Sequence, residues 1–300
     1  MKPLVIYHAD CTDGFGAAFA AWKSMGDDAE YVPCRYGGIN PANLADLTDD
    51  REVYILDFSF PRVQMDSLFT NAKRVVWLDH HKTAFEMWCD NGERKHYHCL
   101  LDDRAQHHIT LDNDKSGALL AWEYFHPGTE VPMLIQHIDD RDRWQWRLKG
   151  SAEIHAALSS YQPWTFEQWK EGLADNDWYG QLWTEGAAIL RAQKQYVERM
   201  AKQARKCKIV IRTEQYGCTG EDGLATNTPI HQSEVGHELA NQSGTYGLVF
   251  YLASDGRVRC SLRSNGEYDV SAIARSFGGG GHRNAAGFET DVETLMGWLK

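Results

Sequence analysis

Short apolar runs separated by amphipathic stretches organise the first third of the chain. Residues 4–7, 53–56 and 75–78 form three such runs, and residues 31–34 form a weaker one. The Ala-rich stretch 14–25 follows the first run and predicts a helix. Apolar strands that alternate with helical stretches are typical of βαβ units. The pattern therefore predicts an α/β domain with a mainly parallel sheet and helices on both faces.

Beyond residue 116 the pattern becomes helical, and residues 185–205 have a helical period with basic residues toward the end, where they favour the helix dipole. Strands are expected at 208–212, 247–253 and 258–263, with a hairpin turn at the SDG sequence 254–256. We therefore predict an N-terminal domain over 1–184, a connecting helix over 185–206 and a smaller α/β domain over 207–300.

The composition of the chain limits the kinds of ligand and partner that the protein is expected to bind. The formal charge of −11 opposes binding to a long duplex nucleic acid, which normally needs a basic track, but permits a small phosphorylated ligand held through metal ions. Seven scattered cysteines without a CxxC pair suit reduced thiols in a cytoplasmic protein. Neither a transmembrane run nor a signal peptide is expected, so no membrane partner is predicted.

Polar residues with metal-binding chemistry gather at the predicted strand ends. His8, Asp57 and Asp79 each fall just past such an end, where ligands bind in parallel sheets. The neighbouring candidates are Asp10, Asp13, His80 and His81, and a later acidic cluster contains Asp139, Asp140 and Asp142.

Carboxylates combined with imidazoles suit Mn²⁺, with Mg²⁺ or Co²⁺ as alternatives, and the clusters hold enough ligands for two ions that share a carboxylate. A single Asp after a strand is more often a turn former or a helix cap, and Asp13 could cap the helix that starts at Gly14. Three strand ends that converge on such residues favour the metal centre.

The four glycines 278–281 form a second candidate site. Glycine lets backbone N–H groups approach a phosphate closely, and His282 and Arg263 could contact the same ligand. The alternatives are a flexible linker for the glycines and a surface salt bridge for Arg263. The linker is disfavoured because the run lies between apolar segments.

Other candidates are weaker. His107 and His108 lie in a polar stretch without nearby carboxylates, so a metal role is not expected. Trp144 and Trp146 are expected to pack in a core or a domain interface, with base stacking as the alternative. Cys11 is disfavoured as a nucleophile because nearby carboxylates would raise its pKa.

Two sets of motifs resemble a known family. His8-x-Asp10-x-x-Asp13-Gly14, Asp57, Asp79-His80-His81 and the later Asp cluster resemble the four motifs of the DHH phosphoesterases. The C-terminal part resembles the DHHA1 substrate-binding domain through Arg263-Ser264, the glycine run with His282, and the AAGF sequence 285–288. The resemblance spans nearly the whole chain.

The resemblance implies a role for each matching residue. One metal ion would be held by His8, Asp10 and Asp57, and the other by Asp13, Asp57, His80 and Asp140. Asp79 would orient His80, and His81 would face the substrate phosphate as a catalytic group. Substrate would be bound by Arg263, Ser264, Gly279, Gly280, Gly281 and His282. Many relatives space the first carboxylates as Asp-x-Asp, so the metal that Asp10 and Asp13 each bind stays open, as does the choice of Asp140 over Asp139 and Asp142.

The expected activity is therefore hydrolysis of short oligonucleotides or dinucleotides to 5′-mononucleotides through a water activated by two metal ions. A phosphomonoesterase acting on pAp is an alternative enzyme, and a nucleotide-binding regulator with an inactive metal site is an alternative of another class. A processive exonuclease is disfavoured by the acidic charge. Oligomeric state is left open, with a homodimer as one option.

Overall fold

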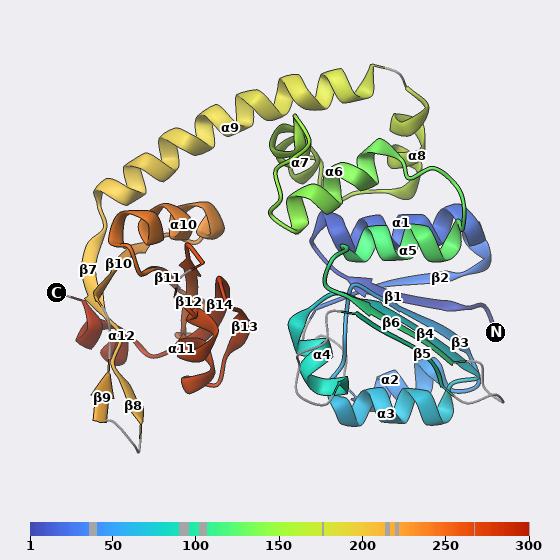
Figure 1. Ribbon diagram of the computed structural model, residues 1–300, viewed down its shortest axis with the longest axis horizontal. Coiled ribbons are helices and arrows are strands. Elements are labelled where there is room, and N and C mark those ends of the chain that lie inside the picture. Colours follow the sequence, from blue (N-terminus) through green and yellow to red (C-terminus); the bar gives the residue numbers. More distant parts are fainter. Residues whose placement is uncertain are drawn as a thin grey trace. The chain divides into compact units, whose positions relative to one another are not determined.

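The computed structural model describes residues 1–35, 41–89, 96–101, 107–175, 177–213, 217–219, 222–266 and 268–299. The chain folds into two compact units, Met1–Leu190 and Arg191–Lys300, and the division between them falls within the long helix α9 (Trp178–Lys202) (Figure 1). The prediction from sequence treated residues 185–206 as a separate connecting helix. In the structure, the same helix contributes to both units.

A six-stranded sheet forms the centre of the first unit. Its order is β2-β1-β3-β4-β6-β5, and every neighbouring pair is parallel except β5 with β6. The strands are β1 (Leu4–His8), β2 (Glu30–Cys34), β3 (Glu52–Leu56), β4 (Arg74–Asp79), β5 (His96–Leu101) and β6 (His107–Asp112). The predicted α/β class with a mainly parallel sheet is confirmed.

Helices cover both faces of this sheet, with α1 and α5 on one side and α2, α3 and α4 on the other (Figure 1). Further helices α6, α7 and α8 add to the first side. The bounds are α1 (Thr12–Met25), η1 (Gly26–Asp28), α2 (Pro41–Thr48), α3 (Arg62–Asn71), α4 (Lys82–Trp88), α5 (Gly117–Phe125), α6 (Met133–Asp142), α7 (Ser151–Ser160) and α8 (Phe166–Ala174).

Alternate side chains of each strand enter two different cores, because successive residues of a strand point to opposite faces. Leu56 and Leu78 pack in the core beneath α1 and α5, whereas Ile55 and Trp77 pack in the core beneath α3 and α4. Burial of each such side chain contributes about 1.5–3 kcal/mol. This two-sided burial explains why the strands are continuous apolar runs, and it fixes which residues emerge at their ends.

The second unit contains a mixed sheet in the order β13-β14-β12-β11-β10-β7, in which only the pair β10 and β11 is parallel. Helix α10 packs on one face, and α11 and α12 belong to the core on the other. The bounds are β7 (Arg205–Lys208), β8 (Ile211–Thr213), β9 (Gly217–Thr219), β10 (Asp222–Asn227), α10 (Gln232–Ser243), β11 (Tyr246–Leu252), β12 (Val258–Ser264), α11 (Val270–Ser276), β13 (Gly280–His282), β14 (Ala285–Thr290) and α12 (Val292–Trp298).

The predicted hairpin around the SDG turn is confirmed, since β11 and β12 pair in antiparallel fashion with Gly256 at φ 80° between them. The strand expected at 208–212 divides between β7 and β8, and β14 was not predicted. In the ranges that the structure describes, none of the helices combines the length and apolar character needed to cross a membrane.

Candidate active site

The carboxyl ends of three adjacent strands bring the predicted metal ligands together. His8 ends β1, Asp79 ends β4, and Asp57 directly follows β3, which lies between them. Asp57 has a φ of 54°, a left-handed conformation that is uncommon for residues other than glycine and tends to occur at functional sites. The strand order therefore places one carboxylate between two groups of histidines.

Asp57 is the centre of the cluster. Its Oδ1 lies 3.1 Å from His80 Nε2 and 3.7 Å from His81 Nδ1, and its Oδ2 lies 3.6 Å from His8 Nδ1. Asp57 is 1% exposed, and its Oδ1 has no hydrogen bond of good geometry despite the nearby imidazole. A buried carboxylate oxygen with unused capacity beside imidazole nitrogens fits a divalent cation as its missing partner.

A second group of ligands adjoins the first through His80. Its Nε2 lies 3.5 Å from Asp13 Oδ2 and 3.5 Å from Asp142 Oδ2. The potential ligand atoms of these three residues all lie within 4.8 Å of one another, as do those of Asp57, His80 and His81. Each group offers three potential ligand atoms, and the two groups overlap at His80.

The N-terminus of helix α5 holds the Asp13 carboxylate and packs against Asp57. Asp13 accepts hydrogen bonds from the backbone N–H groups of Gly117 at 2.8 Å and Ala118 at 2.9 Å. Gly117 also lies against Asp57, because a Cβ at this position would come within 2.4 Å of the Asp57 Cβ. Asp13 thus satisfies unpaired N–H groups of α5, the helix that follows Ser116, rather than those of α1.

The charges of the cluster shift its pKa values strongly. Burial raises the pKa of Asp13, and the carboxylates of Asp57 and Asp142 raise it further. Burial would lower the pKa of His80, but the adjacent Asp57 carboxylate and the charge of Asp142 outweigh that effect and raise it well above the usual value. Burial would raise the pKa of Asp57, but the imidazoles of His8 and His80 beside its carboxylate oxygens reverse this and lower it. Such a concentration of buried carboxylates is the environment that a divalent cation stabilises.

Asp79 holds His81, whereas the sequence interpretation paired it with His80. Its Oδ1 lies 2.7 Å from His81 Nδ1 and accepts the backbone N–H groups of His80 at 2.7 Å and His81 at 3.1 Å. Burial would lower the pKa of His81, but Asp79 and Asp57 raise it to about 9. The second His of the motif is therefore the one with a fixed ring orientation.

In the second unit, Arg263 and His282, two of the predicted substrate-binding residues, share one face of the sheet. Arg263 of β12 and His282 of β13 both lie opposite Ala285 on the strand between them. Neighbouring strands are about 4.8 Å apart, so the two residues are about 10 Å apart. Arg263 donates to Ser233 Oγ at 2.7 Å, and Ser264 is buried, with its Oγ 3.2 Å from Asn284 Oδ1.

The glycine run lies at the edge of this sheet. A Cβ at Gly279 would come within 2.1 Å of the Gly287 carbonyl oxygen, and Gly281 has a φ of 138°. These glycines are thus required by close packing against β14, and Gly280 belongs to β13. The linker alternative is wrong for this segment, because it pairs as a strand inside the unit.

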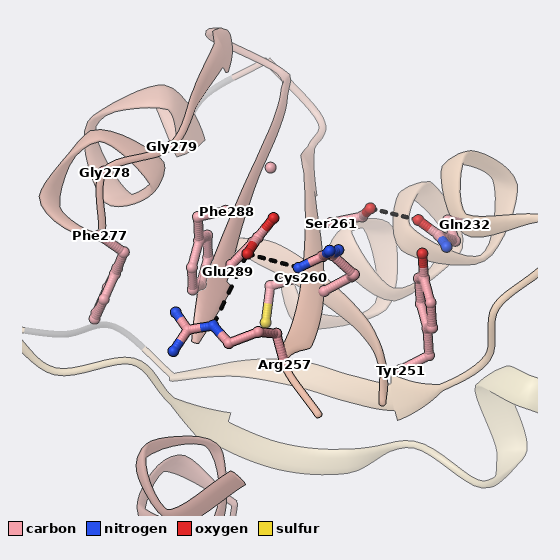
Figure 2. A pocket seen from close by; sticks show the side chains of 12 residues that line it. Gln232, Tyr251, Arg257, Cys260, Ser261, Phe277, Gly278, Gly279, Phe288 and Glu289 are labelled. Atoms are coloured by element: carbon pink, nitrogen blue, oxygen red, sulfur yellow. Dashed lines mark hydrogen bonds and ion pairs between the residues drawn. The ribbon is translucent and has the colours of Figure 1, made fainter. Parts of the chain in front are cut away.

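A hollow of about 560 Å³ opens on the same face, further along the strands (Figure 2). Tyr251, Arg259 and Glu289 occupy opposing positions of three adjacent strands there, and Gly278 and Gly279 form another side of the hollow. Glu289 lies 2.6 Å from Arg259 Nη1. The hollow offers an aromatic ring, guanidinium groups and a carboxylate to a ligand, and the sequence interpretation did not include it.

Comparison with known proteins identifies a domain in the second unit and relatives along nearly the whole chain. A family model described as "DHHA1 domain" matches residues 226–299. Over 320 residues the chain is 23% identical to the oligoribonuclease NrnB of Bacillus subtilis, covering 94% of this chain and 71% of that protein. Residues 226–299 therefore match a DHHA1 domain, and nearly the whole chain is similar to an oligoribonuclease.

Two further similarities extend over most of the chain. The chain is 30% identical over 307 residues to an uncharacterized protein, R106, of Acanthamoeba polyphaga mimivirus, covering 95% of this chain. It spans 66% of the length of that relative. The fold resembles that of a pGpG-specific phosphodiesterase from Vibrio cholerae, with a TM-score of 0.50, 13% identity and coverage of 98% and 94% of the two chains.

Two of the metal ligands predicted from the sequence lie apart from the cluster. The Asp10 carboxylate is exposed and forms an ion pair with Arg35, which lowers its pKa. The Asp140 carboxylate accepts N–H groups of Arg147 at 2.7 Å and Leu148 at 3.1 Å, and is thereby used within its own loop. The structure therefore brings Asp142, and not Asp140, to the histidines.

Cys11 lies beside the cluster, although the sequence interpretation considered it only as a nucleophile. Its Sγ lies 3.5 Å from His8 Nδ1 and 3.6 Å from Asp57 Oδ2. Burial raises the pKa of this thiol, and Asp57 and Asp13 raise it further, in the expected direction. Five cysteines are free thiols in the structure, while the side chains of Cys99 and Cys218 lie outside the described residues.

Proposed function

We propose that this protein is a metal-dependent phosphodiesterase that hydrolyses short oligonucleotides or dinucleotides to 5′-mononucleotides. The observation that carries the proposal is the buried carboxylate of Asp57, which lies among three histidines at the ends of adjacent parallel strands. The similarity to an oligoribonuclease supports the class of substrate. The acidic charge of −11 supports a short substrate over a long one.

The residues divide into ligands and orienting groups. His8 and Asp57 would hold one divalent cation, and the other would be held by Asp57, Asp13, His80 and Asp142. Two such ions would lower the pKa of a water molecule and neutralise charge on the phosphate. The mixture of imidazoles and carboxylates favours Mn²⁺.

His81 has a separate role in this proposal. Asp79 occupies its Nδ1, so the ring would meet a phosphate oxygen through Nε2 as a hydrogen-bond donor. In the second unit, Arg263 and His282 would bind the terminal nucleotide, because a guanidinium forks onto phosphate oxygens. A cytosolic location is consistent with free thiols and remains a prediction.

An assay of the purified protein tests the proposal directly. With Mn²⁺, we expect cleavage of a linear dinucleotide and a five-residue RNA to 5′-mononucleotides, with the products identified by mass. The panel also contains pAp and a cyclic dinucleotide. Phosphate release from pAp without dinucleotide cleavage would favour a phosphomonoesterase. Tight nucleotide binding without Mn²⁺ uptake or turnover would favour a regulator instead.

A further inference from the structure

Residues 141–149, with the sequence RDRWQWRLK, form a segment that differs from the rest of the chain. Four cations and one carboxylate surround two tryptophans, in a protein whose formal charge is −11. We call residues 141–149 the basic–aromatic segment. Basic groups interleaved with aromatic rings are the features by which proteins bind single-stranded nucleic acid.

The two tryptophans of this segment are exposed rather than packed in a core, which was one of the two positions expected for them. Trp144 is 43% exposed and Trp146 is 41% exposed. Their rings contact each other edge to face, with centroids 4.9 Å apart. Large aromatic side chains are normally buried, so a pair held at the surface indicates a binding surface.

The backbone at both tryptophans adopts an energetically unfavourable conformation. Trp144 has a φ of 57° and Trp146 a φ of 55°, in the left-handed region that bulky residues rarely adopt. Strain of this kind persists only where surrounding contacts determine it, and it is concentrated at functional sites. The conformation turns the two rings outward rather than toward a core.

Asp140 provides the contacts that determine this conformation. Its carboxylate accepts the N–H groups of Arg147 and Leu148, and its backbone oxygen accepts the N–H of Gln145 at 2.8 Å. Ser151 Oγ donates to the same carboxylate at 2.6 Å. The carboxylate that sequence interpretation assigned to the metal centre is thus the group that shapes the segment with the tryptophans.

The segment is also joined directly to the metal cluster. Asp142 lies within it and is 3.5 Å from His80, and Trp144 follows only two residues later. The Arg141 guanidinium lies 5.9 Å from the ring of Trp144, and its buried Nε has no hydrogen-bond partner in the described part of the chain. Arg147 is exposed and, among the described residues, forms no ion pair. Cationic and aromatic groups therefore lie within a few residues of the proposed ligands.

We propose that the basic–aromatic segment binds a nucleobase of a single-stranded oligonucleotide by stacking on Trp144 and Trp146, while Arg147 contacts a backbone phosphate. The proposal rests on the proposed function for the identity of the neighbouring scissile bond.

The stacking can be tested by binding, without turnover. Metal-free protein is titrated by calorimetry with a five-residue RNA and with an abasic oligomer of the same length and charge. We expect Trp144→Ala and Trp146→Ala each to weaken RNA binding by about 5- to 150-fold and to remove most of the preference over the abasic oligomer. Trp144→Phe and Trp146→Phe should each retain much of the affinity for RNA and of the preference over the abasic oligomer. Arg147→Ala should weaken the binding of both oligomers to a similar extent and reduce the salt dependence of binding.

Tyr161→Ala is the matched control, because Tyr161 is an aromatic side chain of the same unit with a similar exposure of 40%. It should bind both oligomers like the wild type. Equal binding of RNA and abasic oligomer by the wild type, or unchanged binding in both Trp variants, would overturn the proposal. A shift of the variants from dimer to monomer in sedimentation, with RNA binding retained, would show that a second copy covers the tryptophans.

Failure of the stacking proposal and failure of the proposed hydrolysis give different results. Wild-type protein that binds RNA through the tryptophans but cleaves no phosphodiester with Mn²⁺ would refute the enzymatic proposal alone. Protein that cleaves RNA, with KM unaffected in the Trp variants, would refute the stacking alone. If the variants reduce kcat without raising KM, the segment is structural and the stacking is again refuted.

Discussion

At the scale of single residues, the site depends on which neighbouring aspartate reaches the histidines. Asp139 accepts the N–H of Ser116, Asp140 binds its own loop, and Asp142 approaches His80. All three lie within the last turn of α6, so small differences in position direct them to different partners. The sequence alone could not separate them, because each is an Asp near the end of the same helix.

This separation predicts opposite effects for two similar substitutions. Asp142→Asn should lower kcat/KM at least about 100-fold with little effect on the unfolding free energy, since it removes charge from the metal centre. Asp140→Asn should cost about 1–3 kcal/mol of stability, because it weakens hydrogen bonds to a buried carboxylate. Turnover at saturating Mn²⁺ and chemical denaturation measure the two effects. A loss of stability in Asp142→Asn with full activity would reverse the assignment.

At the scale of elements, α5 positions the carboxylates of the metal centre through its first turn. The contact is close enough that Gly117 has no room for a side chain beside Asp57. The sequence predicted the helix that begins after Ser116, but not its contact with Asp13, which is 104 residues away from Gly117 in the chain. Such long-range contacts depend on packing of α1 against α5 and leave no local signal.

Gly117→Ala tests whether this helix terminus sets the geometry of the site. The added methyl group would force α5 away from Asp57, so we expect kcat/KM to fall at least about tenfold, as small misplacements in a catalytic site are costly. Gly180→Ala in α9 is the control, because nothing lies within 4 Å of its Cβ position. That variant should keep full activity and be slightly more stable. Full activity of Gly117→Ala would show that Asp57 tolerates the shift.

How much of the site the sequence could predict differs from one element to another. Strands β1, β3 and β4 were predictable because burial on both faces gives continuous apolar runs, and their order made the site predictable at His8, Asp57 and Asp79. The position of Asp10 was not predictable from the sequence, since Asp10 has a left-handed φ of 63° and its carboxylate pairs with Arg35. The exposure of Trp144 was missed as well, because an apolar side chain in sequence is read as buried.

At the scale of the whole molecule, two units carry two separable kinds of chemistry. The first unit collects carboxylates and imidazoles around Asp57, and the second presents Arg263 and His282 on one face of its sheet. In the proposed function, the first set holds the metal ions and the second set binds the nucleotide. Ligand binding stabilises only the state that contains the folded site, so thermal stability can report on each unit in turn.

A crossed experiment therefore tests the division of labour. Mn²⁺ at about 100 times its Kd should stabilise the wild type by about 2.7 kcal/mol and raise its Tm, and this shift should vanish in Asp57→Asn but persist in His282→Ala. Nucleotide binding in EDTA, measured by calorimetry, should weaken in His282→Ala and persist in Asp57→Asn. Because the two substitutions lie in different units, their effects on binding should be independent of each other. If both variants lost the Mn²⁺ shift, or both lost nucleotide binding, metal and nucleotide would share one set of residues, and the separation of roles would be wrong.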